Sequence, residues 1–231
     1  MVLVLFDIDG TLITSGGTGR KAIAKALSDY CGVEIDMSRV QLGGRTDPAI
    51  VRDILRLSGV EEERISDLIP TCLELYASEL EKTILPEHVT LLPGVSSLLQ
   101  QLHEHPDYDL ALITGNMQRT AYMKLGAGNI SSYFPCGGFG SDSEFRSYLP
   151  EVARDRASLH YGKPYSPSKT IVIGDTEHDI SCSRHFGAWA IAVSTGMNSH
   201  ETLASCKPDL LVPSLAEEKV VWGFFESVLN A

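Results

Sequence analysis

Val2-Leu3-Val4-Leu5-Phe6-Asp7-Ile8-Asp9-Gly10-Thr11 opens the chain with a continuous apolar run that ends in two acidic residues. Such a run is typical of a strand that is covered on both faces, as in a parallel sheet. Side chains alternate along an extended strand, so Asp7 and Asp9 are expected to point the same way. Two adjacent carboxylates repel each other unless a cation is present. The stretch therefore predicts a buried strand whose end carries chemistry. An ordinary polar strand end followed by a turn is the plain structural alternative.

Similar apolar runs recur along the chain, with helical patterns between them. The expected strands are 108–113, 169–174, 189–193 and 210–212, and the expected helices are 95–104, 118–126, 148–161, 178–187 and 214–228. Strands that alternate with helices predict βαβ units and a doubly wound sheet. We therefore expect an α/β fold with a mostly parallel, Rossmann-like sheet.

Residues 15–90 interrupt this alternation. A glycine-rich start at 15–19 is followed by helical patterns at about 19–31, 47–58 and 61–82, with no convincing strand between them. The economical interpretation is a small helical cap domain at 15–90, inserted after the first strand, and a core domain made of 1–14 and 91–231. Ligands bind at the carboxyl edge of open α/β sheets, so the cap is expected to cover that edge.

Composition narrows the class of protein. The 231 residues carry a formal net charge of −11, which argues against a nucleic-acid partner because phosphate contacts need clustered Lys and Arg. The five cysteines show no CxxC spacing and are expected to be reduced thiols. No stretch approaches the length of a membrane span. We expect a cytoplasmic monomer or weak homodimer with no membrane partner.

Polar motifs follow two of the later strands. In Gly174-Asp175-Thr176-Glu177-His178-Asp179, the acidic residues 175 and 179 flank a strand-to-helix turn. In Thr114-Gly115-Asn116, a hydroxyl group and backbone N–H groups at a helix start form a phosphate-sized anion site. The plain alternatives are an acidic helix start and a simple N-cap. Because parallel strands end at the same edge, the acidic residues are expected to converge, and oxygen ligands of this kind suit magnesium.

The three motifs, in this order, resemble those of the haloacid dehalogenase-like hydrolase superfamily, and the resemblance spans nearly the whole chain. Residues 15–90 resemble the helical cap that this superfamily often inserts after its first motif. The resemblance implies a magnesium-dependent phosphatase acting on a small phosphorylated metabolite. Asp7 would be the nucleophile that forms an aspartyl-phosphate. Asp9 would first protonate the leaving oxygen and then activate water.

The resemblance also implies which residues hold the ion and the phosphoryl group. Magnesium would be held by Asp7, Asp9 through its backbone carbonyl, and Asp175, with Asp179 close by. Thr114, Gly115 and Asn116 would hold the phosphoryl oxygens. A phosphomutase and a non-catalytic phosphate-binding regulatory module remain as alternatives.

The sequence departs from the family pattern at one cation. The family normally has a Lys before the helix that precedes the last acidic motif, and no Lys fits that place here. Lys163 follows the helix, and Lys124 is expected to face solvent. Arg146 directly precedes helix 148–161, so we expect it to replace the Lys, with Lys163 as second choice. The plain alternative is that Arg146 is an ordinary loop cation, and the missing Lys favours the non-catalytic module.

The cap contributes one further candidate. Gly43-Gly44-Arg45-Thr46-Asp47 resembles the cap loop of phosphoglycolate phosphatase-like members, and Arg45 is expected to pair with a carboxylate or second phosphate of the substrate. The same residues also fit a simple helix start, with Thr46 or Asp47 as the N-cap and Pro48 at the first helical position. A cap that closes over the site would favour a small substrate.

Overall fold

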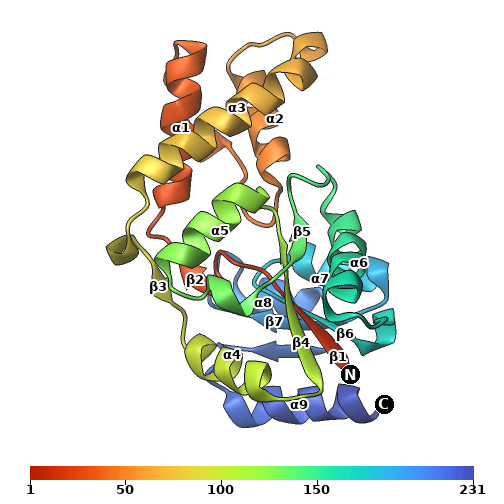
Figure 1. The fold of residues 1–231 in the computed structure, drawn as a ribbon. Coiled ribbons are helices and arrows are strands. Elements are labelled where there is room, and N and C mark those ends of the chain that lie inside the picture. Colours follow the sequence, from red (N-terminus) through yellow and green to blue (C-terminus); the bar gives the residue numbers. More distant parts are fainter.

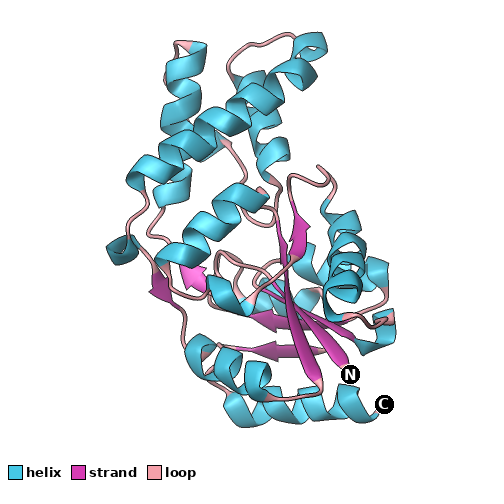
Figure 2. Cartoon of the chain, viewed as in Figure 1, coloured by secondary structure: helices cyan, strands magenta, loops and turns pink.

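The computed structural model describes residues 1–231, and a six-stranded parallel sheet lies at its centre (Figures 1 and 2). The strand order is β5-β4-β1-β6-β7-β8. These strands are β1 (Val2–Phe6), β4 (Tyr108–Thr114), β5 (Gly137–Phe139), β6 (Thr170–Gly174), β7 (Trp189–Val193) and β8 (Leu210–Val212). The predicted fold class, an α/β protein with a doubly wound parallel sheet, is confirmed.

Nine α-helices accompany the strands. They are α1 (Thr18–Cys31), α2 (Asp47–Leu57), α3 (Glu62–Thr83), α4 (Val95–Glu104), α5 (Gln118–Ala127), α6 (Leu149–Tyr161), α7 (Glu177–Phe186), α8 (His200–Ser205) and α9 (Glu218–Asn230). Every helix expected from the sequence is present. The short helix α8 and the strand β5 were not expected.

Strand β1 is apolar throughout because its two faces enter different cores. Val4 and Phe6 belong to a core of 27 buried residues that includes residues of α4, α5 and α9. Leu3 and Leu5 belong to a core on the opposite face, packed with residues of α6 and α7. All four side chains are fully buried. Helices thus cover both faces, as continuous apolar strands require.

The helices α1, α2 and α3 stand apart from the sheet at the top of Figure 1. They share a third core of 16 buried residues, to which Met117 at the start of α5 also belongs. A short antiparallel pair, β2 (Ile13–Thr14) and β3 (Thr90–Leu91), lies where the chain leaves and re-enters the sheet region. We propose on this basis the division expected from the sequence, with a cap at 15–90 and a core at 1–14 and 91–231.

The sheet order creates one crevice. From the central β1 the chain adds β4 and β5 on one side and then β6, β7 and β8 on the other. The strand order therefore reverses at β1, and the carboxyl ends of β1, β4 and β6 meet there, where open α/β sheets bind ligands. None of the helices is both long enough and apolar enough to cross a membrane.

Candidate active site

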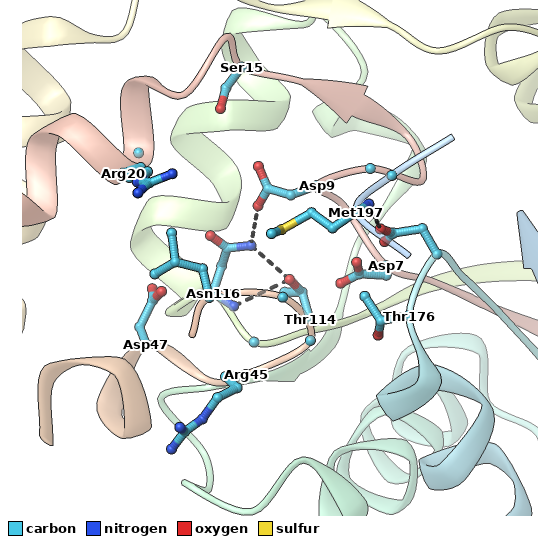
Figure 3. Close-up of a pocket in the computed structure, with 18 of the residues that line it drawn as sticks. Asp7, Asp9, Ser15, Arg20, Arg45, Asp47, Thr114, Asn116, Thr176 and Met197 are labelled. Atoms are coloured by element: carbon cyan, nitrogen blue, oxygen red, sulfur yellow. Dashed lines mark hydrogen bonds between the residues drawn. The ribbon is translucent and has the colours of Figure 1, made fainter. Parts of the chain in front are cut away.

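A cavity of about 460 Å³ lies between the carboxyl ends of the strands and the cap helices. Figure 3 shows its walls, with acidic residues of the sheet edge facing the Thr114 loop and the start of α2. Cap residues such as Arg20, Ile50 and Tyr76 complete the lining. The cavity therefore draws on both parts of the molecule.

Three of the four predicted metal ligands meet at this edge of the sheet, and two of them, Asp7 and Asp175, line the cavity. Carboxylate oxygens of Asp7, Asp175 and Asp179 lie within 4.8 Å of one another, and all three residues are buried. The meeting follows from the sheet, because β1 and β6 are paired neighbours and the Asp7 N–H donates to the carbonyl of Ile173 at 2.9 Å. The side chain of Asp9 is not part of this group.

Burial and crowding make the carboxyl groups of Asp7 and Asp175 weak acids. Burial raises the pKa of Asp7 to about 7, with further increases from Asp179 and Asp9 and an opposing effect of Arg146. Burial also raises the pKa of Asp175 to about 8, followed by repulsion from Asp7 and Asp179. The cluster has more negative charge than its one cation balances, which is the condition in which a divalent ion binds well.

Arg146 is the cation of this cluster, at the position expected from the sequence. Its Nη2 donates to Asp7 Oδ1 at 3.0 Å and to Asp179 Oδ1 at 2.5 Å, and the side chain is only 8% exposed. A short 3₁₀ helix (Arg146–Tyr148) before α6 places it there. A Cβ added at Gly115 would lie 3.1 Å from Arg146 Nη1, so this nitrogen faces the predicted phosphate loop.

The alternative cation lies elsewhere. Lys163 Nζ pairs with Asp109 Oδ2 at 2.7 Å. Asp109 is the second residue of β4 and pairs in register with Leu3, so it lies towards the amino end of the sheet. The structure therefore does not bring Lys163 to the acidic cluster.

Asp179 also lies in the first turn of α7, as in the acidic helix start of the plain alternative, and it pairs there with the N-cap residue Thr176. Asp179 Oδ2 accepts from the Thr176 N–H at 3.0 Å and from the Thr176 hydroxyl at 2.6 Å, which completes a capping box. A Cβ added at Gly174 would lie 2.1 Å from Asp179 Cγ, so glycine is required at the strand end. Asp179 is thus a member of the capping box and of the acidic cluster at once.

Asp9 points to the other side of the cavity. Its Oδ2 accepts from Asn116 Nδ2 at 2.8 Å and from Lys124 Nζ at 2.6 Å. The expectation that Lys124 faces solvent is wrong, because its side chain is only 6% exposed. Helix α5 begins directly after the Thr114 loop and directs Lys124 back over it, where the cap covers it. The helical pattern of α5 alone does not show that the cap buries this side chain.

The predicted phosphate loop forms one wall of the cavity (Figure 3). Thr114 is fully buried, and its Oγ1 accepts from Asn116 Nδ2 at 2.8 Å. A Cβ added at Gly115 would lie 2.0 Å from the carbonyl oxygen of Arg45, so only glycine permits this close approach. The loop of the cap therefore rests directly on the predicted phosphate loop.

Arg45 itself is turned away from the acidic cluster. Its Nη1 pairs with Asp53, and Figure 3 shows its guanidinium directed away from Asp7 and Asp9. Its contact with a substrate anion stays a prediction. The predicted helix start is confirmed, because Thr46 is the N-cap and its hydroxyl accepts from the Ala49 N–H; Asp47 takes the first helical position, and Pro48 is the second residue of the helix.

The sequence reasoning missed the segment after β7. The Met197 N–H donates to Asp175 Oδ2 at 3.0 Å, and the Thr195 hydroxyl donates to the Gly10 carbonyl at 2.6 Å. A Cβ added at Gly196 would lie 1.7 Å from Asp175 Oδ2. The position of Thr195-Gly196 could have indicated this segment, because it follows the expected strand 189–193 and so lies at the same edge of the sheet as the three motifs.

Comparisons with known proteins agree with this fold. The family model described as haloacid dehalogenase-like hydrolase matches residues 4–193. Phosphoglycolate phosphatase of Vibrio vulnificus is 26% identical over 222 residues, covering 93% of this chain and 93% of that protein. Pyrophosphatase PpaX of Anoxybacillus flavithermus is 24% identical over 222 residues, covering 95% of this chain and 96% of that protein.

Solved structures share the fold. A predicted phosphatase from Clostridium acetobutylicum superposes with a TM-score of 0.73 at 19% identity, covering 100% of this chain and 99% of that chain. A β-phosphoglucomutase from Clostridium difficile gives 0.72 at 20% identity, covering 100% and 98%. Because the family model spans most of its length, the chain belongs to the haloacid dehalogenase-like hydrolases.

Proposed function

We propose that the protein is a magnesium-dependent phosphatase that hydrolyses a small phosphate monoester through an aspartyl-phosphate on Asp7. The observation that carries this proposal is the meeting of the Asp7, Asp175 and Asp179 carboxylates within 4.8 Å. Relatives that align over almost the whole chain are named as phosphatases, which supports the reaction class. The acidic composition and the enclosed cavity favour a small substrate over a nucleic acid.

The acidic cluster fits magnesium by its chemistry. Its donors are hard carboxylate oxygens with no Cys or His among them, and the raised pKa values of Asp7 and Asp175 reflect burial and mutual repulsion that a divalent ion would relieve. Asp7 and Asp175 would hold the ion with the Asp9 carbonyl, and Asp179 would lie beside it. Bound magnesium supplies the positive charge that lets a phosphate anion approach a carboxylate.

Side chains of the protein carry out the phosphoryl transfer and the proton transfers. Asp7 attacks phosphorus, and Asp9 gives a proton to the oxygen that leaves. Arg146 already contacts Asp7 and faces Gly115, so it can hold the transferring phosphoryl oxygens together with the Thr114 loop. Water then attacks the phosphorylated Asp7 while Asp9 takes its proton. The missing family Lys was the one feature that favoured the non-catalytic module. If Arg146 takes its role, that argument no longer holds.

One observation favours a second candidate, a phosphomutase. The fold is shared with a protein named β-phosphoglucomutase, at a TM-score of 0.72. A mutase passes the phosphoryl group from the phosphorylated Asp7 to a sugar phosphate, and it must retain the resulting sugar bisphosphate until that gives a phosphoryl group back to Asp7. Turnover of a hexose phosphate only in the presence of a bisphosphate primer, without release of inorganic phosphate, would favour the mutase.

The deciding experiment is phosphate release with magnesium present, over sugar phosphates, nucleotides, phosphoglycolate and p-nitrophenyl phosphate. Wild type should turn over at least one ester, and Asp7→Asn should be inactive on all of them. Asp155→Asn is a matched control, because the Asp155 side chain is 65% exposed. If wild type and Asp7→Asn were equally inactive across the panel, the non-catalytic module would be favoured instead.

A further inference from the structure

Lys124 holds a buried ammonium group beside the predicted acid–base residue. Its Nζ donates to Asp9 Oδ2 at 2.6 Å and to Asn116 Oδ1 at 2.7 Å. The Lys124 side chain is 6% exposed, whereas that of Asp9 is 41% exposed and faces the cavity. Lys124 therefore contacts the Asp9 carboxyl group on its buried side, and the exposed side of that carboxyl group remains available to a ligand.

The ammonium also fixes the amide of Asn116. An ammonium group only donates hydrogen bonds, so it must face the amide oxygen. The amide nitrogen is then directed to Asp9 Oδ2 and to Thr114 Oγ1, each at 2.8 Å. Through this one contact, Lys124 sets the relative positions of the acid–base residue and the phosphate loop.

The cap completes the enclosure of Lys124. A Cβ added at Gly19 of α1 would lie 3.4 Å from Lys124 Nζ and 3.4 Å from the Tyr76 hydroxyl of α3. From α2, Asp47 lies close enough for Lys124 to lower its pKa. All three cap helices thus face this ammonium, and its burial depends on the cap lying over the core.

We propose that Lys124 is a positioning residue for the reaction, which aims the Asp9 carboxyl at the leaving oxygen of the substrate. This inference rests on the proposed phosphatase function. In the first step the bond from phosphorus to the leaving oxygen breaks, and that oxygen keeps the electron pair and takes the proton of Asp9. In the second step water attacks phosphorus and gives a proton to Asp9, and the bond to Asp7 breaks with its electron pair returning to the carboxylate. Lys124 keeps its protons throughout.

The test compares two kinds of leaving group. The aryl oxygen of p-nitrophenyl phosphate departs without a proton, whereas the alkyl oxygen of glycerol 2-phosphate needs one. Lys124→Met should lower kcat/KM, which reports only the steps up to departure of the leaving group, roughly 100-fold more for the alkyl ester than for the aryl ester, which is within the range that a positioned general acid contributes. Lys163→Met is the matched control, because Lys163 is also a paired lysine but lies on Asp109. It should keep the wild-type ratio of the two rates.

A double-mutant cycle separates positioning from a general structural role. If Lys124 acts through Asp9, adding Lys124→Met to Asp9→Asn should cause no further loss on the alkyl ester. Lys124→Arg, which keeps the charge and supports folding if the Met variant unfolds, should still reduce the alkyl rate more than the aryl rate. Equal losses on both esters, or additive losses in the double variant, would overturn the proposal for Lys124 alone. An inactive wild type would overturn the phosphatase function and this inference with it.

Discussion

Arg146 and Lys124 are cations of the cavity, and each pairs with a different carboxyl group of strand β1 and its continuation. Arg146 contacts Asp7, and Lys124 contacts Asp9. The sequence predicted the place of Arg146, because it precedes the helix before the last acidic motif. It could not predict that of Lys124, because the side that a helix buries depends on the cap packed over it, which no local pattern of α5 encodes.

The buried ion pairs of Arg146 give the first prediction. Arg146→Ala should lower phosphate release at least 100-fold, because two buried carboxylates lose their partner and the phosphoryl group loses a donor. The loss of stability should be about 3–5 kcal/mol, the range for removal of one partner of a buried pair. Steady-state kinetics and urea unfolding measure both effects. Lys163→Ala is the comparison, and a greater loss of activity in that variant would reverse the assignment of the cation.

Protons and magnesium compete for the carboxylates of Asp7 and Asp175, and this competition gives the second prediction. Their pKa values are raised from 3.8 to about 7 and about 8, so the metal-free folded protein binds more protons than the unfolded chain through this range. Stability without metal should therefore fall as the pH rises from about 4 to about 8. Magnesium requires the ionised carboxylates, so its affinity should increase over the same range.

Thermal unfolding at pH 6 and pH 8.5, with and without magnesium, tests this linkage. The increase in Tm caused by magnesium should be larger at pH 8.5. Asp175→Asn should abolish most of that increase, while the exposed control Asp155→Asn should keep it. An equal increase in Tm at both pH values would mean that the acidic cluster does not bind the ion.

At the scale of elements, the contact between α2 and α5 ties the cap to the core. Asp47, in the first turn of α2, accepts from the Met117 N–H at 2.8 Å and from the Thr120 hydroxyl at 3.3 Å, both at the start of α5. Its own N–H donates to the Gly115 carbonyl at 2.7 Å. A carboxylate at a helix N-terminus is favoured by the helix dipole. The first turns of two helices thus meet next to the predicted phosphate loop.

This contact predicts a separate effect on stability and on substrate affinity. Asp47→Ala should reduce stability by about 1–3 kcal/mol, since it leaves buried donors without an acceptor. It should also raise KM more than it lowers kcat, because the cap then rests less firmly on the core. Steady-state kinetics and chemical denaturation give both quantities. Arg119→Ala is a suitable control, because it removes exposed cap–core ion pairs with Glu74 and Glu81 that contribute little.

The contribution of the Asp47 contact to stability should depend on pH, and the raised pKa of Asp47 fixes the direction of that dependence. Burial raises the pKa of Asp47 from 3.8 to about 6, with Lys124 opposing the increase. The folded protein therefore holds this proton between about pH 4 and pH 6, and the contribution of Asp47 to stability decreases as the pH rises through that window. Asp47→Asn should lose this pH dependence. An unchanged pH profile of unfolding in Asp47→Asn would show that the Asp47 carboxyl does not titrate there.

Elements with a strong apolar pattern were predictable, and elements held by close packing were not. The expected strands at 108–113 and 169–174 agree with β4 and β6. Strand β5 contains Gly137 and Gly138, which have low strand propensity. A Cβ added at Gly138 would lie 2.2 Å from the carbonyl oxygen of Leu149, so this glycine is needed for α6 to pack on the strand. Such a requirement becomes visible only once the partner helix is placed.

At the scale of the whole molecule, the resemblance of three short motifs predicted the family and the fold, and both are confirmed. The motifs lie far apart in the chain but at adjacent strand ends of one sheet, which is why a topology argument from strand order could bring them together. The direction of each side chain at that edge was less predictable. Asp9 turns from the acidic cluster towards Lys124, because α5 and the cap supply a partner there.

The distribution of charge over the molecule gives the last prediction. The cavity is lined by four cations, Arg20, Arg45, Lys124 and Arg146, and by four acidic residues, Asp7, Asp9, Asp47 and Asp175. With all eight groups ionised, these side chains carry no net charge, while the whole chain carries a formal charge of −11. An anionic substrate approaching from a distance should be repelled by the molecule as a whole. Salt screens charges beyond a Debye length of about 10 Å at 0.1 M.

Raising the ionic strength from about 10 mM to about 200 mM at fixed free magnesium should therefore raise kcat/KM for a phosphate ester about twofold. A variant that adds charge far from the cavity, Lys25→Glu on the exposed face of α1, should make this increase larger because its side chain is 59% exposed. Magnesium must be held constant, since its own binding also weakens with salt. A steep fall of kcat/KM with salt would instead mean that the cavity cations attract the substrate over long range, and that the acidic surface plays no part in its capture.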